Sequence, residues 1–244
     1  MRHPTNLTIS TAVGLLVVVT CPFFSLLYFV GGGLGATLAH VSGSSLASSI
    51  AVLTALALVL NCLALLAVIL FYERQSLGSV GLTKMSGVDL LVAAGAVWFI
   101  LYTHVLIIRW DLLGVLRGRA GRGGSLLLRL SPYAHRARLT ASAAWEELAF
   151  RAYLIERVRG LTGNIWIAAA VSAVVSVIWH IPGWGPEQSL LLGGGQLLLI
   201  LLYVWRRNLP TCFIAHFASN LLPAVLSRLP LEIQSQLLRF LFPL

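Results

Sequence analysis

The sequence predicts an all-α integral membrane protein, a polytopic transmembrane bundle of seven or eight helices that occupies residues 1–244 as a single domain. Its composition is the first reason, because 58% of the 244 residues are hydrophobic, only 10% are charged, and the mean hydropathy is +0.90. A soluble domain of this length has a more highly charged surface. The second reason is that long apolar runs alternate with short polar gaps, as in chains that cross a bilayer repeatedly.

Seven of these apolar runs are long enough to cross a bilayer as helices. They are Ile9–Val30, Leu46–Tyr72, Val88–Ile108, Leu139–Ile155, Ile165–Ile181, Ser189–Trp205 and Pro210–Leu226. The first is long and soon followed by others, so we do not expect it to be only a cleaved signal peptide. The tail Leu231–Leu244 is apolar but short, which leaves an eighth span open.

The net charge of +9 comes almost entirely from arginine, which supplies 16 of the 17 basic residues. Seven of these arginines lie in residues 109–138, a segment that also contains several glycines. We interpret it as a basic, flexible loop that follows the positive-inside rule. No aromatic interleaving or nucleic-acid-binding motif accompanies the arginines, so nucleic acid is not an expected partner.

Polar side chains gather in the fourth, fifth and seventh apolar runs, whereas the first three contain no acid or base in their interiors apart from His104 near an end. Ionisable groups at bilayer depth cost several kcal/mol, so they usually face the interior of a bundle and usually have a function. The six residues are Glu146, Glu147, Arg151, His180, His216 and Asn220. Because they are concentrated in one part of the chain, they predict a site.

Helical spacing assigns different roles to the two glutamates. Glu147 and Arg151 are four residues apart with the acid first, which favours an ion pair that makes both charges tolerable in a bundle. Glu146 is turned about 100° from Glu147 around the helix. The residue four positions after Glu146 is Phe150, so we expect no partner for Glu146 on its own helix. Glu146 therefore suits a general base, and the other two residues are expected to support the site.

The remaining polar residues complete a plausible hydrolytic site. His180 lies where Pro182 is expected to end the fifth span. His216 and Asn220 are four residues apart and share a face of the seventh span. The carboxylate and one histidine can activate water, while the second histidine and the amide stabilise an oxyanion. Simple alternation of the spans, however, places Glu146 and His180 nearer one membrane surface and His216 nearer the other.

At these residues the chain resembles the CPBP family of intramembrane proteases, the CAAX-processing and bacteriocin-processing enzymes related to the Rce1 endopeptidase. The family motif E-E-x-x-x-R is matched by Glu146, Glu147 and Arg151, and H-x-x-x-N by His216 and Asn220. The motif F-x-x-x-H is matched only at its histidine, His180, because Ser176 occupies the usual phenylalanine position. The resemblance covers about residues 139–223, which form the expected catalytic core.

The resemblance implies an intramembrane active-site cavity in which Glu146 and His180 activate water while His216 and Asn220 hold the tetrahedral intermediate. It implies no cofactor. The zinc motif H-E-x-x-H is absent, although two histidines with Glu146 could still ligate zinc, so a zinc-dependent protease stays an alternative. The expected partners are the lipid bilayer and a membrane-associated peptide or protein substrate, prenylated or bearing a leader. We expect a multi-pass protein of a bacterial inner membrane.

Three other functions compete with this interpretation. A catalytically silent scaffold or immunity protein with the same fold has little reason to keep every site residue. A transporter would have polar residues in the first spans and broken helices in matching halves. A cysteine protease based on Cys212 and His216 lacks a neighbour that would activate the thiol. The sequence leaves the substrate, the membrane orientation and the oligomeric state open.

Overall fold

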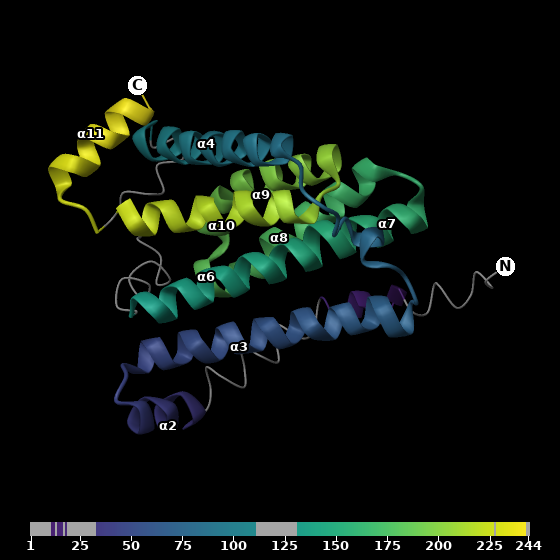
Figure 1. The fold of residues 1–244 in the computed structure, drawn as a ribbon, viewed down its shortest axis with the longest axis horizontal. Helices are drawn as coiled ribbons and strands as arrows, with labels where there is room; N and C mark the ends of the chain where they lie inside the picture. Colours follow the sequence, from purple (N-terminus) through teal and green to yellow (C-terminus); the bar gives the residue numbers. More distant parts are fainter. Residues whose placement is uncertain are drawn as a thin grey trace.

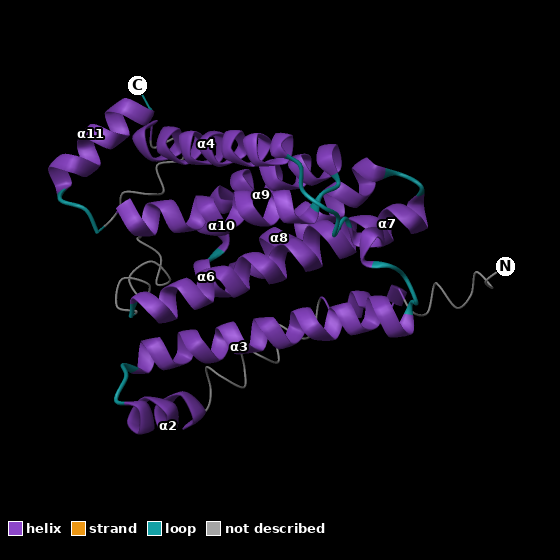
Figure 2. Cartoon of the chain, in the orientation of Figure 1, coloured by secondary structure: helices purple, strands orange, loops and turns teal. Residues whose placement is uncertain are grey.

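The computed structural model describes residues 11–12, 14–16, 18, 33–110, 131–226 and 228–242. Every regular element in these ranges is a helix, which confirms the predicted all-α class (Figure 2). Most of the first apolar run and most of the basic loop predicted at 109–138 lie outside the described residues.

In chain order, the described helices are α2 (Gly33–Ser42), α3 (Leu46–Ala67), the π-helix η1 (Val68–Tyr72), the 3-10 helix η2 (Leu77–Val80), α4 (Gly87–Trp110), α6 (Pro132–Glu146), the π-helix η3 (Glu147–Leu154), α7 (Ile155–Thr162), α8 (Ile165–Trp184), α9 (Pro186–Arg206), α10 (Leu209–Leu226) and α11 (Leu231–Leu241). Figure 1 shows the long helices running roughly side by side, with α2 and α3 at one edge of the bundle and α4 and α11 at the other.

Five of the described helices are long and apolar enough to cross a membrane. These spans are Leu46–Tyr72, Gly87–Leu106, Ile165–Pro182, Pro186–Arg206 and Leu209–Leu226, and they coincide closely with five predicted runs. The protein is therefore an integral membrane protein. Helix α11 has 11 residues and extends about 16 Å, roughly half the thickness of a hydrocarbon core, and it is not among these five spans. The total of seven or eight spans stays a prediction.

The helix that begins the site is longer than the sequence predicted. α6, η3 and α7 follow without a break, so the helical segment starts seven residues before the expected start at Leu139. Its first turn is set by Pro132 at N1 and by Ser131, whose side chain accepts a hydrogen bond from the backbone of Ala134. The backbone N–H of Ser131 donates to Ser48 Oγ of α3 (3.0 Å), which ties the two helices together. Glu146 lies near the middle of this segment, as it does in the shorter predicted run.

Two glycines of α9 allow close packing against its neighbours. A Cβ at Gly193 would lie 3.2 Å from Val177 Cγ2 of α8, and a Cβ at Gly195 would lie 3.2 Å from His104 Cε1 of α4. Side chains larger than hydrogen would force these helices apart. The close contact brings the next residue of α9, Gln196, into the polar interior described below.

A second buried polar cluster lies just beyond η1, and we name it the Glu73 cluster (Glu73, Tyr153 and Arg157). Arg157 grips both carboxylate oxygens of Glu73, with its Nη2 2.6 Å from Oε2 and its Nε 2.9 Å from Oε2 and 3.2 Å from Oε1. The hydroxyl of Tyr153 donates to Oε1 (2.6 Å), and the guanidinium of Arg157 stacks over the Tyr153 ring. The cluster fastens the end of α3–η1 to η3 and α7.

Candidate active site

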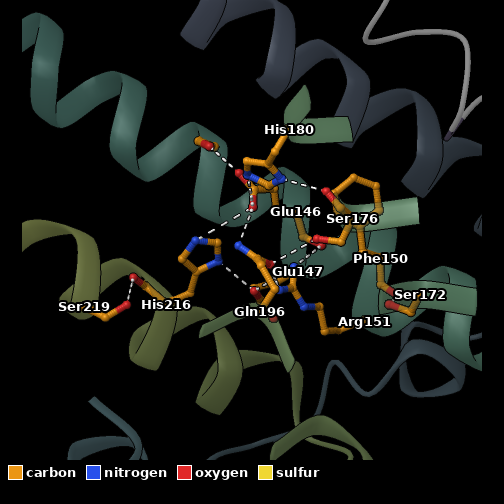
Figure 3. A network of polar contacts seen from close by, with 11 residues as sticks. Glu146, Glu147, Phe150, Arg151, Ser172, Ser176, His180, Gln196, His216 and Ser219 are labelled. Carbon is orange, nitrogen blue, oxygen red and sulfur yellow. Dashed lines mark hydrogen bonds and ion pairs between the residues drawn. The ribbon is translucent and has the colours of Figure 1, made fainter. Parts of the chain in front are cut away.

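The site residues converge from the continuous segment α6–η3 and from the helices α8, α9 and α10, as Figure 3 shows. Glu146 ends α6, and Glu147 and Arg151 lie in η3. His180 comes from α8, Gln196 from α9 and His216 from α10. Glu147 and Arg151 are fully buried, and Glu146 and His216 are 5% and 4% exposed. Residues separated by up to 70 positions in the sequence thus share one small volume.

Glu146 has a partner on its own helix, which corrects the prediction that it has none. The hydroxyl of Ser142, one turn earlier, donates to Glu146 Oε1 at 2.6 Å. The prediction failed because it considered only the residue four positions later, Phe150, and not the residue four positions earlier. The other carboxylate oxygen, Oε2, points toward the two histidines.

The two ring nitrogens of His180 have different neighbours: Nε2 faces Glu146, and Nδ1 contacts a backbone oxygen. Its Nδ1 lies 2.7 Å from the backbone oxygen of Ser176. A carbonyl oxygen only accepts hydrogen bonds, so Nδ1 carries the proton and a neutral ring has its lone pair on Nε2. That Nε2 lies 3.6 Å from Glu146 Oε2. Helix α8 continues to Trp184, four residues beyond His180, although Pro182 was expected to end it.

His216, on α10, also lies close to Glu146 Oε2. Its Nδ1 lies 2.7 Å from Glu147 Oε1, and its Nε2 lies 3.9 Å from Glu146 Oε2. Because the last two atoms lie 3.9 Å apart, the difference in depth between Glu146 and His216 that simple alternation predicted does not arise. Glu146, His180 and His216 are therefore brought together as the sequence predicted.

The predicted pair of Glu147 and Arg151 is present, with Arg151 Nη1 3.3 Å from Glu147 Oε1. The same Glu147 oxygen also lies 2.7 Å from His216 Nδ1, a contact that spacing along one helix does not predict. A carboxylate that accepts from the Nδ1–H of an imidazole fixes the tautomer and the orientation of the ring. Glu147 thus links the structural pair to a residue of the site.

Asn220, by contrast, does not join the network. It follows His216 by one turn of α10 and is partly buried. Among the described residues, no hydrogen bond connects it to Glu146, His180 or His216. Its expected contact with the oxyanion stays a prediction.

Sequence reasoning missed two members of the network, Ser142 and Gln196. Gln196 Oε1 accepts from Arg151 Nη2 and from Ser176 Oγ (3.2 Å), and Gln196 Nε2 donates to Glu146 Oε2 (3.4 Å). A signal for Gln196 existed, because it is an amide inside the sixth apolar run, directly after three glycines. The hydroxyl of Ser142 gave no comparable signal, since serine is common in apolar helices.

The residues that the sequence suggested as zinc ligands are Glu146, His180 and His216. Catalytic zinc takes nitrogen and oxygen donors about 2.0–2.2 Å away in an open tetrahedral arrangement. In the part of the chain that the structure describes, no group of three or more histidine, cysteine, aspartate or glutamate side chains is arranged to hold a metal ion. We therefore route no catalytic step through a metal.

Comparison with known families supports the chemistry that this geometry suggests. Residues 135–222 match the family described as Type II CAAX prenyl endopeptidase Rce1-like. The matched segment contains Glu146, His180, His216 and Asn220, and it confirms the resemblance drawn from the sequence motifs. No curated protein and no solved structure matches the chain. The matched family is a family of endopeptidases that act at membranes, which supports a peptidase.

Proposed function

We propose that this chain is an intramembrane endopeptidase in which Glu146 and His180 activate a water molecule. The observation that carries the proposal is the convergence of two imidazole Nε2 atoms on one carboxylate oxygen, at 3.6 Å and 3.9 Å. These separations exceed an ordinary N–H···O hydrogen bond. The atoms are thus near enough to act on one water molecule without saturating one another.

The charges of the buried groups balance in the state that can start the reaction. Glu146 and Glu147 are anionic, and Arg151 and His216 are cationic, so these four charges sum to zero. In this proposed starting state His216 is an imidazolium, and its Nδ1 lies 2.7 Å from Glu147 Oε1. His180 is neutral, with its Nδ1–H donating to the backbone oxygen of Ser176. Balanced charge makes the burial of this set tolerable.

The first chemical step is attack by water on the scissile carbonyl. Glu146 Oε2 accepts one proton of the water, and the lone pair of His180 Nε2 accepts a hydrogen bond from the second O–H, which orients the nucleophile. The water oxygen bonds to the carbonyl carbon as the C=O π bond opens to an oxyanion. General-base assistance of this kind contributes about 10²–10⁴-fold to a rate.

The second step breaks the C–N bond. His216, as an imidazolium, donates from Nε2 to the oxyanion, and Asn220 adds a donor when substrate brings the groups together. Glu146 then delivers its proton to the amide nitrogen, which leaves as an amine. One water is consumed, and Glu146 returns to its anionic form.

The apolar environment of the site and the family match both support one substrate class. A site inside an apolar bundle favours a peptide that is itself held at the membrane, by a prenyl group or by a hydrophobic leader. A catalytically silent scaffold with the same fold would have no use for the orientation of both imidazoles toward one carboxylate. The five apolar helices support a location in a membrane, and we propose that this is a bacterial inner membrane.

The proposal is tested by the fate of membrane peptides. Peptides from membranes that contain the intact protein are compared by mass spectrometry with peptides from membranes that contain Glu146→Ala, and a farnesylated CAAX peptide is offered to both purified proteins. We expect a cleaved product that depends on Glu146. Identical peptide profiles, together with no cleavage of the CAAX peptide by the intact protein, would overturn the proposal.

A further inference from the structure

The proposed reaction gives no role to the buried amide of Gln196, although this amide contacts Glu146 directly. It is 9% exposed and lies on α9, the helix that carries none of the other site residues. Its amide group contacts Arg151, Ser176 and Glu146 at once (Figure 3). An amide used only for packing would not need donors and acceptors on both sides.

The neighbours of the amide fix which way it faces. A guanidinium has only donors, so the group that faces Arg151 Nη2 must be the oxygen of Gln196. The hydroxyl of Ser176 donates to the same oxygen at 3.2 Å. With the oxygen held from two helices, the NH₂ group is left facing Glu146 Oε2 at 3.4 Å. The orientation is therefore imposed by η3 and α8 and does not depend on Glu146.

The consequence for Glu146 is a carboxylate held at both oxygens. Ser142 donates to Oε1 from α6 itself, and Gln196 donates to Oε2 from α9. Two donors on different oxygens and from different helices restrict rotation of the carboxylate plane. The lone pair of Oε2 that remains available is the one directed toward His180 and His216.

We propose that Gln196 is a positioning residue that aims the Oε2 lone pair of Glu146 at the water, and that Ser176 supports it. This inference rests on the proposed function. It also gives Ser176 a role, because the phenylalanine that the motif leads one to expect could not donate to Gln196. In this chain the position is part of a hydrogen-bonded chain that runs from Ser176 through Gln196 to Glu146.

The first test compares kcat and KM in detergent for cleavage of a farnesylated CAAX peptide. Gln196→Met keeps the length of the side chain and removes both polar atoms. We expect kcat to fall about 10–100-fold, the usual effect of losing an outer partner of a reactive group. KM should stay within about twofold, because Gln196 is not expected to touch the substrate. An unchanged kcat would overturn the inference.

A pair of serines provides a matched control. Ser176 and Ser172 are both buried and lie one turn apart on α8, but Ser172 donates to the backbone oxygen of Phe150 (2.8 Å), outside the network. Ser176→Ala should lower kcat severalfold, whereas Ser172→Ala should leave it unchanged. Equal effects of the two substitutions would show that packing of α8, and not the amide, controls the rate.

Gln196→Glu gives a readout that a purely structural residue would not move. The new carboxylate still accepts from Arg151 and Ser176, but it places a negative charge beside Glu146. The charged or titratable neighbours of Glu146 include Arg138, Arg151, His180 and His216. Repulsion favours the protonated base, so the acidic limb of the pH–rate profile should move to higher pH. A profile that coincides with that of the intact protein would contradict the proposed placement.

The same assay separates this inference from the proposed function. If Glu146→Gln cleaves the peptide as fast as the intact protein, the proposed function is wrong. If Glu146→Gln is inactive while Gln196→Met retains full kcat, only the role of Gln196 is wrong. Each variant is assayed well below its own melting temperature, so that a loss of stability from the unpaired Arg151 donor does not imitate a loss of rate.

Discussion

Two buried glutamates, Glu73 and Glu146, lie in the same bundle with nearly equal exposure, 4% and 5%, but in opposite chemical surroundings. Both oxygens of Glu73 accept hydrogen bonds from Arg157, and Oε1 also accepts a short one from Tyr153. Glu146 accepts one short hydrogen bond from a neutral hydroxyl and one long bond from an amide. Its nearest imidazole nitrogens stay 3.6 Å and 3.9 Å away.

The difference shows how a buried carboxylate can be assigned to structure or to chemistry. A carboxylate saturated by a cation has no lone pair left for water, and its network rigidifies the fold. A carboxylate that accepts only one hydrogen bond at each oxygen, and that faces two imidazole nitrogens beyond hydrogen-bond distance, keeps the capacity to take a proton. The Glu73 cluster holds α3–η1 against η3 and α7, whereas the Glu146 site is arranged to act on a bound molecule.

The largest expected effect comes from Glu147, which pairs with the buried Arg151 and also contacts His216 of the site. Glu147→Ala leaves Arg151 buried and unpaired and also releases the Nδ1 of His216. We expect a loss of about 3–5 kcal/mol in the free energy of unfolding and a loss of activity in the protein that still folds. Thermal melting in detergent, with cleavage assayed on the folded fraction, measures both. Unchanged stability in Glu147→Ala and in Arg151→Ala would show that the pair does not stabilise the bundle.

A smaller effect is expected at the edge of the Glu73 cluster. Tyr153→Phe removes one hydroxyl that donates to Glu73 and keeps the ring under the Arg157 guanidinium. We expect a loss of about 1 kcal/mol in stability, because the carboxylate remains bound by arginine, and no change in kcat. A fall in kcat would mean that the Glu73 cluster is coupled to the Glu146 site through η3 and is not purely structural.

Removal of metal should have the smallest effect. If Glu146 and His180 activate water directly, incubation with a strong chelator leaves the rate unchanged, and the purified protein holds less than one equivalent of zinc. Elemental analysis and the cleavage assay before and after chelation measure this. One zinc per chain, with activity lost on chelation and restored by zinc, would replace the glutamate mechanism with a metal-assisted one.

Much of the fold was predictable because bilayer chemistry leaves few choices. Apolar runs such as 46–72 and 209–226 become helices because a backbone in lipid must satisfy its own hydrogen bonds. The start of α6 at Pro132 was not predictable from hydropathy, because residues 132–138 contain His135, Arg136 and Arg138. It depends on a local cap at Ser131 and on a contact with α3.

The site was predictable where a residue is costly in lipid and unpredictable where it is not. Ionisable side chains inside apolar runs are energetically costly, so the sequence itself pointed to Glu146, Glu147, Arg151, His180 and His216. Spacing along one helix could not show that Glu147 also holds His216, since this contact depends on how α10 packs against η3. Ser142 and Gln196 were missed because hydroxyl and amide groups cost less to bury, and their partners lie on an adjacent turn or on another helix.

The most direct test of the central claim applies one substitution to both glutamates. Glu146→Gln and Glu73→Gln each replace a carboxylate by an amide of the same shape, and the cleavage rate and the melting temperature are measured on the same purified samples. We predict that Glu146→Gln abolishes cleavage while its melting temperature stays close to that of the intact protein. Glu73→Gln should lower the melting temperature and keep the rate per folded molecule. Cleavage at the full rate by folded Glu146→Gln would contradict the account.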